Sequence, residues 1–199
     1  MASKPDKKIN DDMEMLDFSD QVFKIYTEAT TVRVHKVYLS EVISTPFLYK
    51  DLLNFLRTVP SDDLVEFYLA NDGGNAQTMH QIINAIGDCK ASVQMVVDAP
   101  CYSAGAVLAT CGDNLIMKPG TFLMFHNYSM GMMGKGGELA SRIIAEDRYL
   151  SSLMRRILKN FLTNAELTAL EKDQDVYVHE DDPDLMKRFK RRWPKLYPK

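Results

Sequence analysis

Cysteine is scarce in this chain, and long hydrophobic runs are absent from it. The three cysteines, Cys89, Cys101 and Cys111, are odd in number and lack the spacing of metal ligands. We therefore expect reduced thiols, a cytosol-like compartment and no metal site. No apolar stretch approaches the roughly 20 residues that a membrane-spanning helix needs, so we expect no membrane span.

An excess of charge of one sign is also lacking. The 24 lysine and arginine residues stand against 27 acidic residues, giving a net charge of −3. The chain as a whole does not attract nucleic acid electrostatically, and we expect no nucleic-acid partner. A phosphate-binding loop is missing, which argues against ATP hydrolysis and a bound cofactor. The polar, acidic start predicts no secretory signal, and we expect a cytoplasmic protein.

What is present indicates a soluble protein with one main domain: 199 residues, 46% of them hydrophobic and 26% charged. We divide the chain into a flexible N-terminal arm (1–20), a central domain (21–185) and a basic C-terminal tail (186–199). The tail interleaves aromatic residues with lysine and arginine. It either contacts nucleic acid or an acidic partner, or it forms a charged helix whose aromatic residues dock on the domain. We favour the docked helix.

The hydrophobic pattern predicts strands that alternate with helices. Strands are expected at 34–39, 64–69, 93–97, 114–117 and 121–125, and helices at 47–59, around 79–86, at 104–111, 138–161 and 164–171. This alternation favours an α/β fold with βαβ crossovers. The helix 138–161 would extend roughly 35 Å, long for a domain of this size, and such a helix often projects to meet another subunit.

Ser103 is the first candidate for chemistry. It stands where an apolar strand gives way to a helix of small residues, at the positive end of that helix. The N–H of Ala104 is among those that a helix start leaves unpaired. An ordinary interpretation is a helix-capping serine, which the local sequence favours.

Two further segments could complete a site. The turn Asn71–Asn75 follows a strand, and its double glycine can expose N–H groups to a developing anion, although a plain turn uses the same residues. His126 ends an apolar strand, where an imidazole can act as general base or be a packed side chain. An orienting carboxylate could come from Asp173 or Asp175, between which composition does not choose.

In combination these segments resemble the proteolytic subunit of the Clp protease, ClpP. That family combines a Gly-Gly turn after a strand, a serine in a Ser-x-Gly-Ala turn, a histidine ending a Met-x-His strand, and an aspartate beyond a long helix. The corresponding segments here are Asn71–Gly74, Ser103–Ala106, Met124–His126 and the region of Asp173 and Asp175. The resemblance spans roughly residues 34–180. It implies an α/β fold, specifically a ClpP/crotonase-like spiral of βαβ units with a protruding long handle helix.

The resemblance also implies serine endopeptidase activity through a Ser-His-Asp acyl-enzyme mechanism. Ser103 is then the nucleophile and His126 the general base. Asp175 is chosen as the orienting acid, because its distance from His126 fits the family better and an aromatic-containing stretch follows it; Asp173 is the alternative. The backbone N–H groups of Gly74 and Ala104 form the oxyanion hole. Residues expected to bind substrate are Gly73, Tyr128, Ser129, Met130 and Gly131.

The family forms heptameric rings that stack in pairs, so we expect a polypeptide substrate and a homo-oligomeric ring, single or double. Several positions depart from the family. Ala104 replaces a methionine, Asp72 replaces a proline and brings a negative charge toward the oxyanion site, and Asn127-Tyr128 replaces a Gln-Pro pair. The segment before residue 34 does not resemble the family's axial loops, which leaves a Clp-type ATPase partner open. These departures suggest a specialised member, such as a virus-encoded one acting in the host cytoplasm.

Two other functions stay open. One is a catalytically inactive ClpP-like ring subunit, which Asp72 and the uncertain acid would suit. The other is a crotonase-like acyl-CoA enzyme, which uses a similar spiral fold and two backbone N–H groups but needs no serine–histidine pair. Signal-peptide peptidases use a serine–lysine pair, and no lysine here matches theirs.

Overall fold

The computed structural model describes residues 32–197, which belong to one compact unit. The arm at 1–20 and its boundary with the central domain lie outside the described residues. Within residues 32–197, none of the helices is long and apolar enough to cross a lipid bilayer.

The larger sheet has four parallel strands in the order β1-β2-β3-β5. Its strands are β1 (Val34–Leu39), β2 (Leu64–Leu69), β3 (Ser92–Val97) and β5 (Asn114–Met117). The first three strands pair in register, so their carboxyl ends meet at one edge of the sheet. Parallel neighbours require crossover connections, which confirms the predicted βαβ units. The turn that leaves the carboxyl end of β2 carries Gly73 and Gly74, and the segment that leaves β3 leads to Ser103 and Ala104.

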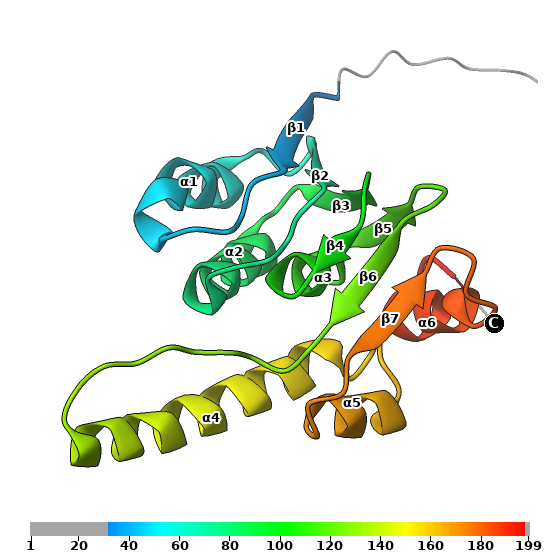
Figure 1. The fold of residues 1–199 in the computed structure, drawn as a ribbon. Coiled ribbons are helices and arrows are strands. Elements are labelled where there is room, and N and C mark those ends of the chain that lie inside the picture. The colour runs from blue at the N-terminus through cyan, green and yellow to red at the C-terminus, as the bar shows by residue number, and fades with distance from the viewer. Residues whose placement is uncertain (1–31, 198–199) are drawn as a thin grey trace, which may run out of the picture. The chain divides into compact units, whose positions relative to one another are not determined.

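Three helices cover one face of this sheet, as Figure 1 shows. They are α1 (Lys50–Thr58), α2 (Ala76–Asp88) and α3 (Ala104–Ala109). Val65, Phe67 and Leu69 alternate along β2 with less buried residues and belong to the core between the layers. The helix predicted at 47–59 is in fact two elements, because Pro46 opens a short 3-10 helix (Pro46–Tyr49) before α1 begins.

A second sheet lies beside the first and has the order β4-β6-β7. β4 (Cys101–Tyr102) is parallel to β6 (Phe122–Phe125), and β7 (Val176–His179) is antiparallel to β6. The strand β7 was not predicted, although its four residues alternate in burial as those of β6 do; acidic segments, more typical of loops, lie on both sides of it. Because β7 runs antiparallel to β6, the acidic segment 171–175, which precedes β7, lies near the end of β6 that leads into His126.

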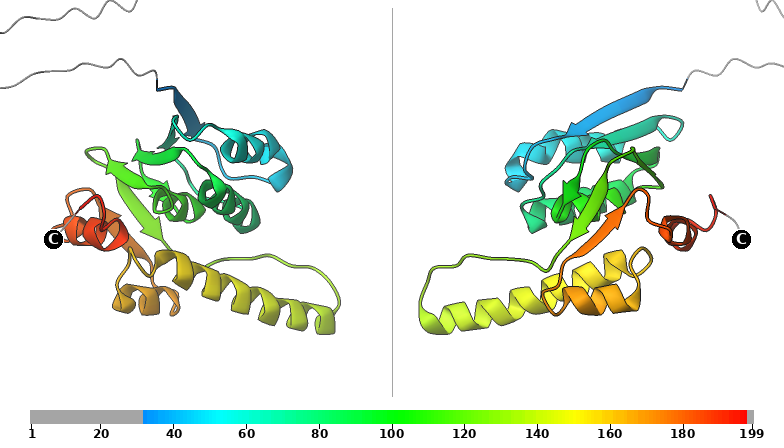
Figure 2. Two further views of the ribbon diagram at one scale, coloured as in Figure 1. Left: turned by 180° about the vertical axis from the view of Figure 1, so that it is seen from behind. Right: turned by 45° about the vertical axis from the view of Figure 1, so that its right-hand side comes forward.

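Helix α4 (Gly136–Leu158) projects from the rest of the described residues over most of its 23 residues (Figure 2). Ile143 and Ile144 on its projecting part are exposed, whereas Leu150, Leu153 and Leu158 near its base are buried. The apolar pattern that predicted a helix up to residue 161 continues to Phe161, but Phe161 is buried in the turn after the helix. The long, protruding helix is confirmed, with both ends shifted by two or three residues.

The C-terminal segment forms helix α6 (Leu185–Arg192), which packs against the base of α4 and against α5 (Asn164–Leu170). Phe189 and Trp193 are buried in the core. The structure therefore agrees with the docked helix and not with a solvated basic arm for nucleic acid.

A buried ion pair fastens α6 to the first turn of α5. Thr163 and Glu166 form a capping box at that turn, and Arg188, only 7% exposed, donates to both carboxylate oxygens of Glu166 at 2.9 and 2.7 Å. Burial by itself would raise the pKa of Glu166, but the hydrogen bonds from Arg188 and Thr163 lower it to about 2. The carboxylate is thus much more stable in the folded protein than in the unfolded chain.

We expect Glu166→Gln to lower the free energy of unfolding by roughly 2–3 kcal/mol at pH 7. Because the folded pKa is depressed, this stabilisation is present above pH 4.5 and disappears as pH falls toward 2. Urea unfolding monitored by the fluorescence of Trp193 measures it. Glu171→Gln breaks the exposed pair with Arg155 and serves as control, with an effect below about 1 kcal/mol. If the variant and wild-type curves stay parallel from pH 7 to pH 2, Glu166 is not the titrating group.

Candidate active site

Ser103 is the single residue between β4 and α3, and two backbone hydrogen bonds from this turn tie it to other segments. The N–H of Ser103 donates to the carbonyl of Met124 on β6 at 2.8 Å, and the N–H of Tyr102 donates to the carbonyl of Asn71 at 2.8 Å. The serine turn is therefore joined both to the strand that ends in His126 and to the turn after β2.

The backbone of Ser103 is strained and its hydroxyl is not used for capping. Its φ of 53° and ψ of −124° lie in a region that residues with a side chain rarely adopt. The side chain makes no capping hydrogen bond with α3. The capping interpretation, which the local sequence favoured, thus does not describe this serine. Strain of this kind at a strand-to-helix turn is typical of an exposed nucleophile.

The double-glycine turn after β2 packs directly against the serine turn. Asn71, buried to 1% exposure, donates through Nδ2 to the carbonyls of Leu39 and Glu41 and accepts the N–H of Gly73 at 2.8 Å. A Cβ built on Gly73 would lie 2.6 Å from the Cβ of Ser103 and 3.0 Å from the nitrogen of Ala104. Only glycine fits this contact, so the two turns lie directly against each other.

Two backbone N–H groups in this region have no acceptor. Within residues 32–197, neither the N–H of Gly74 nor that of Ala104 donates to a backbone or side-chain acceptor. Ala104 is the first residue of α3, where no intrahelical acceptor exists and the helix dipole favours negative charge. Gly74 follows Gly73 and lines the same cavity as Ala104. The two groups that the sequence nominated as an oxyanion hole are thus free to bind an anion.

We expect Gly73→Ala to remove both stability and reactivity, because the new methyl group clashes with the serine turn and φ is +92°. The cost of strain and clash together is at least about 3 kcal/mol of unfolding free energy. Gly120→Ala is the matched control, since Gly120 also has positive φ (+79°) but nothing lies within 4 Å of its added Cβ. Equal destabilisation of the two variants, measured by urea unfolding, would show that contact with Ser103 contributes nothing.

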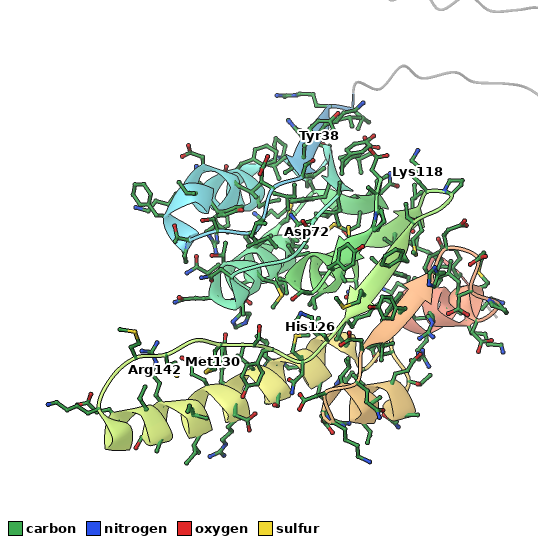
Figure 3. All side chains as sticks on the ribbon, viewed as in Figure 1. Tyr38, Asp72, Lys118, His126, Met130 and Arg142 are labelled. Atoms are coloured by element: carbon green, nitrogen blue, oxygen red, sulfur yellow. The ribbon has the colours of Figure 1, made fainter. Side chains whose placement is uncertain are left out.

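One cavity of about 280 Å³ brings the candidate residues together. It lies between the helical layer and the base of α4. Its walls come from the turn into α2, from the serine turn and α3, from the end of β6 and the loop that follows, and from α4. The lining residues are Gly74, Asn75, Ala76, Met79, Ser103, Ala104, Val107, His126, Tyr128, Ser129, Leu150 and Met154. Figure 3 shows His126 at the end of β6 facing α4.

His126 also borders a second, smaller cavity, of about 30 Å³, on the side of the acidic segment. It therefore lies between the serine and the carboxylates that follow α5. No hydrogen bond joins the hydroxyl of Ser103 to the imidazole within the described residues. Such contacts are often long before substrate binds, so shared lining of one cavity is the informative observation.

The acids of the segment 171–175 differ in their contacts. Glu171 lines the smaller cavity but pairs with Arg155 at 2.8 Å. Asp173, which has a positive φ of 59°, accepts from Nδ2 of Asn127 at 2.8 Å. Asp175 makes no side-chain hydrogen bond with any residue in the part of the chain that the structure describes. The contact of Asp173 with the residue next to His126 was not visible in the sequence. Asp175, which the resemblance favoured, stands opposite His126 when the pairing of β6 and β7 is continued by one residue beyond Phe125 and Val176.

The residues expected to bind substrate divide into two groups. Tyr128 and Ser129 line the cavity. Gly73 does not line it but packs against Ser103, which does. Met130 and Gly131 do not line it and lie farther along the exposed loop that runs beside α4, where Figure 3 marks Met130. The hydroxyl of Tyr128 donates to Asp147 of α4 at 2.7 Å, which together with partial desolvation raises the pKa of Tyr128 to about 12. This bond fixes the start of the loop on the helix.

Asp72, which was expected to bring charge toward the oxyanion site, is exposed and does not line the cavity. Cys101 lies two residues before Ser103, but burial raises the pKa of its thiol to about 11, so it stays protonated and unreactive at neutral pH. Among the described residues, no group of three or more histidine, cysteine or acidic side chains could hold a metal ion.

Sequence reasoning missed two sets of residues. Asn71 was noted as part of a turn, but its buried side chain connects this turn to carbonyl groups 32 and 30 positions earlier in the chain. Leu150 and Met154 were recognised as one side of an amphipathic helix, and nothing in the pattern showed that this side forms a cavity wall. The one local signal that could have marked Asn71 is its position just after an apolar strand and before a double glycine.

Comparison with known proteins agrees with the fold and the motifs. The family model described as Clp protease matches residues 19–180, most of the chain. The search of curated proteins returned no match. The chain therefore belongs to the Clp protease family, whose members are typically serine peptidases.

Proposed function

We propose that this chain is a serine endopeptidase that hydrolyses peptide bonds through an acyl-enzyme intermediate. One observation carries the proposal: a single cavity is lined by the strained, uncapped Ser103, by His126, and by Gly74 and Ala104, whose N–H groups have no acceptor. A nucleophile, a base and two anion-binding donors around one space are what acyl transfer requires.

In the proposed reaction, His126 takes the proton of the Ser103 hydroxyl as the oxygen attacks the carbonyl carbon of the peptide bond. The resulting oxyanion binds the N–H groups of Gly74 and Ala104. His126 then returns the proton to the leaving amine, which departs and leaves an ester on Ser103. Water, activated by the same imidazole, attacks the ester, and the released serine oxygen regains its proton.

We propose Asp175 as the acid that orients His126, with Asp173 as the alternative. The antiparallel register of β6 and β7 supports this assignment, because Phe125 lies opposite Val176 and the next positions along the two strands are His126 and Asp175. A carboxylate in that place would select the required tautomer and stabilise the imidazolium during the reaction. Asp173 accepts a hydrogen bond from Asn127, the residue after the histidine, and is the second candidate.

We further propose that the active form is a homo-oligomeric ring in the cytoplasm, with a polypeptide substrate and no cofactor. The exposed Ile143 and Ile144 on the projecting part of α4 support an oligomer, because exposed apolar side chains in such a helix favour burial against another subunit. Whether an ATPase delivers the substrate stays open. Native mass spectrometry gives the number of chains in the ring.

The proposal is tested by incubating the purified full-length chain with a fluorophosphonate and measuring its intact mass. We expect one adduct per chain, located by digestion on the peptide that contains Ser103, together with cleavage of unfolded casein. Intact rings without an adduct would identify an inactive subunit. Absence of an adduct together with binding of an acyl-CoA would favour the crotonase-like alternative.

A further inference from the structure

Helix α6 and the residues after it lie beyond the part of the chain that matches the family, which ends at residue 180. Figure 2 shows α6 at the end of the described unit opposite to the free end of α4. The segment is strongly basic, and its three arginines, of which Arg191 is exposed, all donate hydrogen bonds to other parts of the protein. Arg188 makes the buried pair with Glu166, and the other two donate at or just beyond the ends of helices, as follows.

Arg191 holds the turn that follows α4. Its Nη2 donates to the carbonyl of Phe161 at 2.6 Å, and its Nε donates to the carbonyl of Asn160 at 3.2 Å. These carbonyls lie two and three residues beyond the last residue of α4. A guanidinium near the C-terminal end of a helix also interacts favourably with the negative end of the helix dipole.

Arg192 and Trp193 make the equivalent contacts at the end of α3. Arg192 donates through Nε to the carbonyl of Thr110 at 2.8 Å, and Trp193 donates through Nε1 to the carbonyl of Gly112 at 2.9 Å. Thr110 is the residue that ends α3. The ring of Trp193 also packs edge-on against Phe161, with centroids 6.3 Å apart. Arg191, Arg192 and Trp193, which are adjacent in the chain, thus contact both the turn after α4 and the end of α3.

The two helices held in this way form opposite walls of the candidate active site. α3 begins directly after Ser103 and contributes Ala104 and Val107 to the cavity, and the base of α4 contributes Leu150 and Met154. α3 is six residues long, so its capped end lies only about 9 Å from the serine turn. A displacement of one end of so short and buried a helix moves the other end with it.

We propose that the C-terminal segment 185–197 is a positioning clamp that fixes α3 against the base of α4 and thereby holds Ser103 in place within the cavity. Arg192 is its main positioning residue, because it acts on α3 through a charged hydrogen bond and does not contact the cavity. The effect on catalysis rests on the proposed function, whereas the effect on α3 does not.

The clamp is tested with Arg192→Ala in the full-length chain. Lys190→Ala on the same helix is the matched control, since Lys190 is exposed and its side chain contacts no hydrogen-bonding partner within residues 32–197. Hydrogen–deuterium exchange is followed on peptides covering α3, and the rate of fluorophosphonate labelling is measured in parallel. Arg192→Lys, which keeps a positive donor, tests rescue.

We expect Arg192→Ala to accelerate exchange in α3 by roughly tenfold, the size expected for one charged hydrogen bond, and to slow labelling by a similar factor. Lys190→Ala stays within twofold of wild type, and Arg192→Lys recovers part of both losses. Unchanged exchange in Arg192→Ala overturns the clamp. Faster exchange with unchanged labelling overturns the positioning of Ser103. If wild type is not labelled at all, the proposed function fails, while the exchange data still decide the clamp.

Discussion

Ser103→Ala is expected to abolish fluorophosphonate labelling and to lower the rate of peptide hydrolysis by at least about 10⁴-fold. The expectation follows from the turn between β4 and α3, where the hydroxyl is uncapped, the backbone is strained and the cavity opens beside it. Alanine removes only one oxygen atom from the site. The fold should persist, and the residual rate reports what the N–H groups and binding contribute without a nucleophile.

Intact mass and a fluorogenic peptide assay measure the two effects. Ser152→Ala is the control, because Ser152 is exposed on α4 and its side chain contacts no hydrogen-bonding partner in residues 32–197. It should be labelled and active at the wild-type level. An adduct that persists on Ser103→Ala would show that another residue is the nucleophile. The buried thiol of Cys101 is a poor substitute, since its pKa of about 11 keeps it protonated.

Asp175→Asn is expected to lower kcat by about 10³–10⁴-fold and to leave KM little changed. The amide keeps the size of the carboxylate but removes the charge that stabilises the imidazolium formed in the transition state. Labelling by fluorophosphonate should slow by a similar factor, since it depends on the same activated serine. The expectation rests on the register of β6 and β7, in which the position after the Phe125–Val176 pair is that of His126 and Asp175.

Asp173→Asn provides the comparison within the same segment. Both aspartates are exposed, so neither substitution should affect the free energy of unfolding strongly. We expect the loss in Asp173→Asn to stay below about tenfold, because its carboxylate is hydrogen-bonded to Asn127 and it lies two positions before the residue that the register places opposite His126. The reverse order of the two effects would identify Asp173 as the orienting acid. Equal, small effects would point to a serine–histidine pair without an acid.

Much of the fold could be predicted because it is encoded locally. The strands β1 and β2 have the predicted bounds, since alternation of buried and less buried residues is a property of the strand itself. The protruding helix was predicted from its apolar stripe and its length. There are two exceptions: Pro46 opens a 3-10 helix in place of the first turn of the predicted helix, and β7 alternates like β6 but lies between acidic segments, which are more typical of loops.

The candidate site could be predicted only in part. Ser103, Gly74 and His126 were each predicted to follow a strand, but their convergence was implied by the family resemblance and not by the alternating pattern, because β2 belongs to one sheet and β4 and β6 to another. The contacts that support them join segments far apart in the chain. Asn71 holds carbonyls of residues 39 and 41, and Arg192 holds the carbonyl of Thr110 from 82 positions away. No periodicity or propensity reports such pairings.

The sequence by itself determined the class of fold, the membership of the central domain in the Clp protease family and the order of the candidate residues. Only the tertiary structure decided that Ser103 does not cap its helix, that β7 brings the acidic segment back to the end of β6, and that the C-terminal tail docks on the domain. The physical reason is the range of the forces involved. Secondary structure depends on neighbours within a few residues, whereas an uncapped hydroxyl, an unpaired N–H or a capped helix end depends on which remote groups the packing brings within about 3 Å.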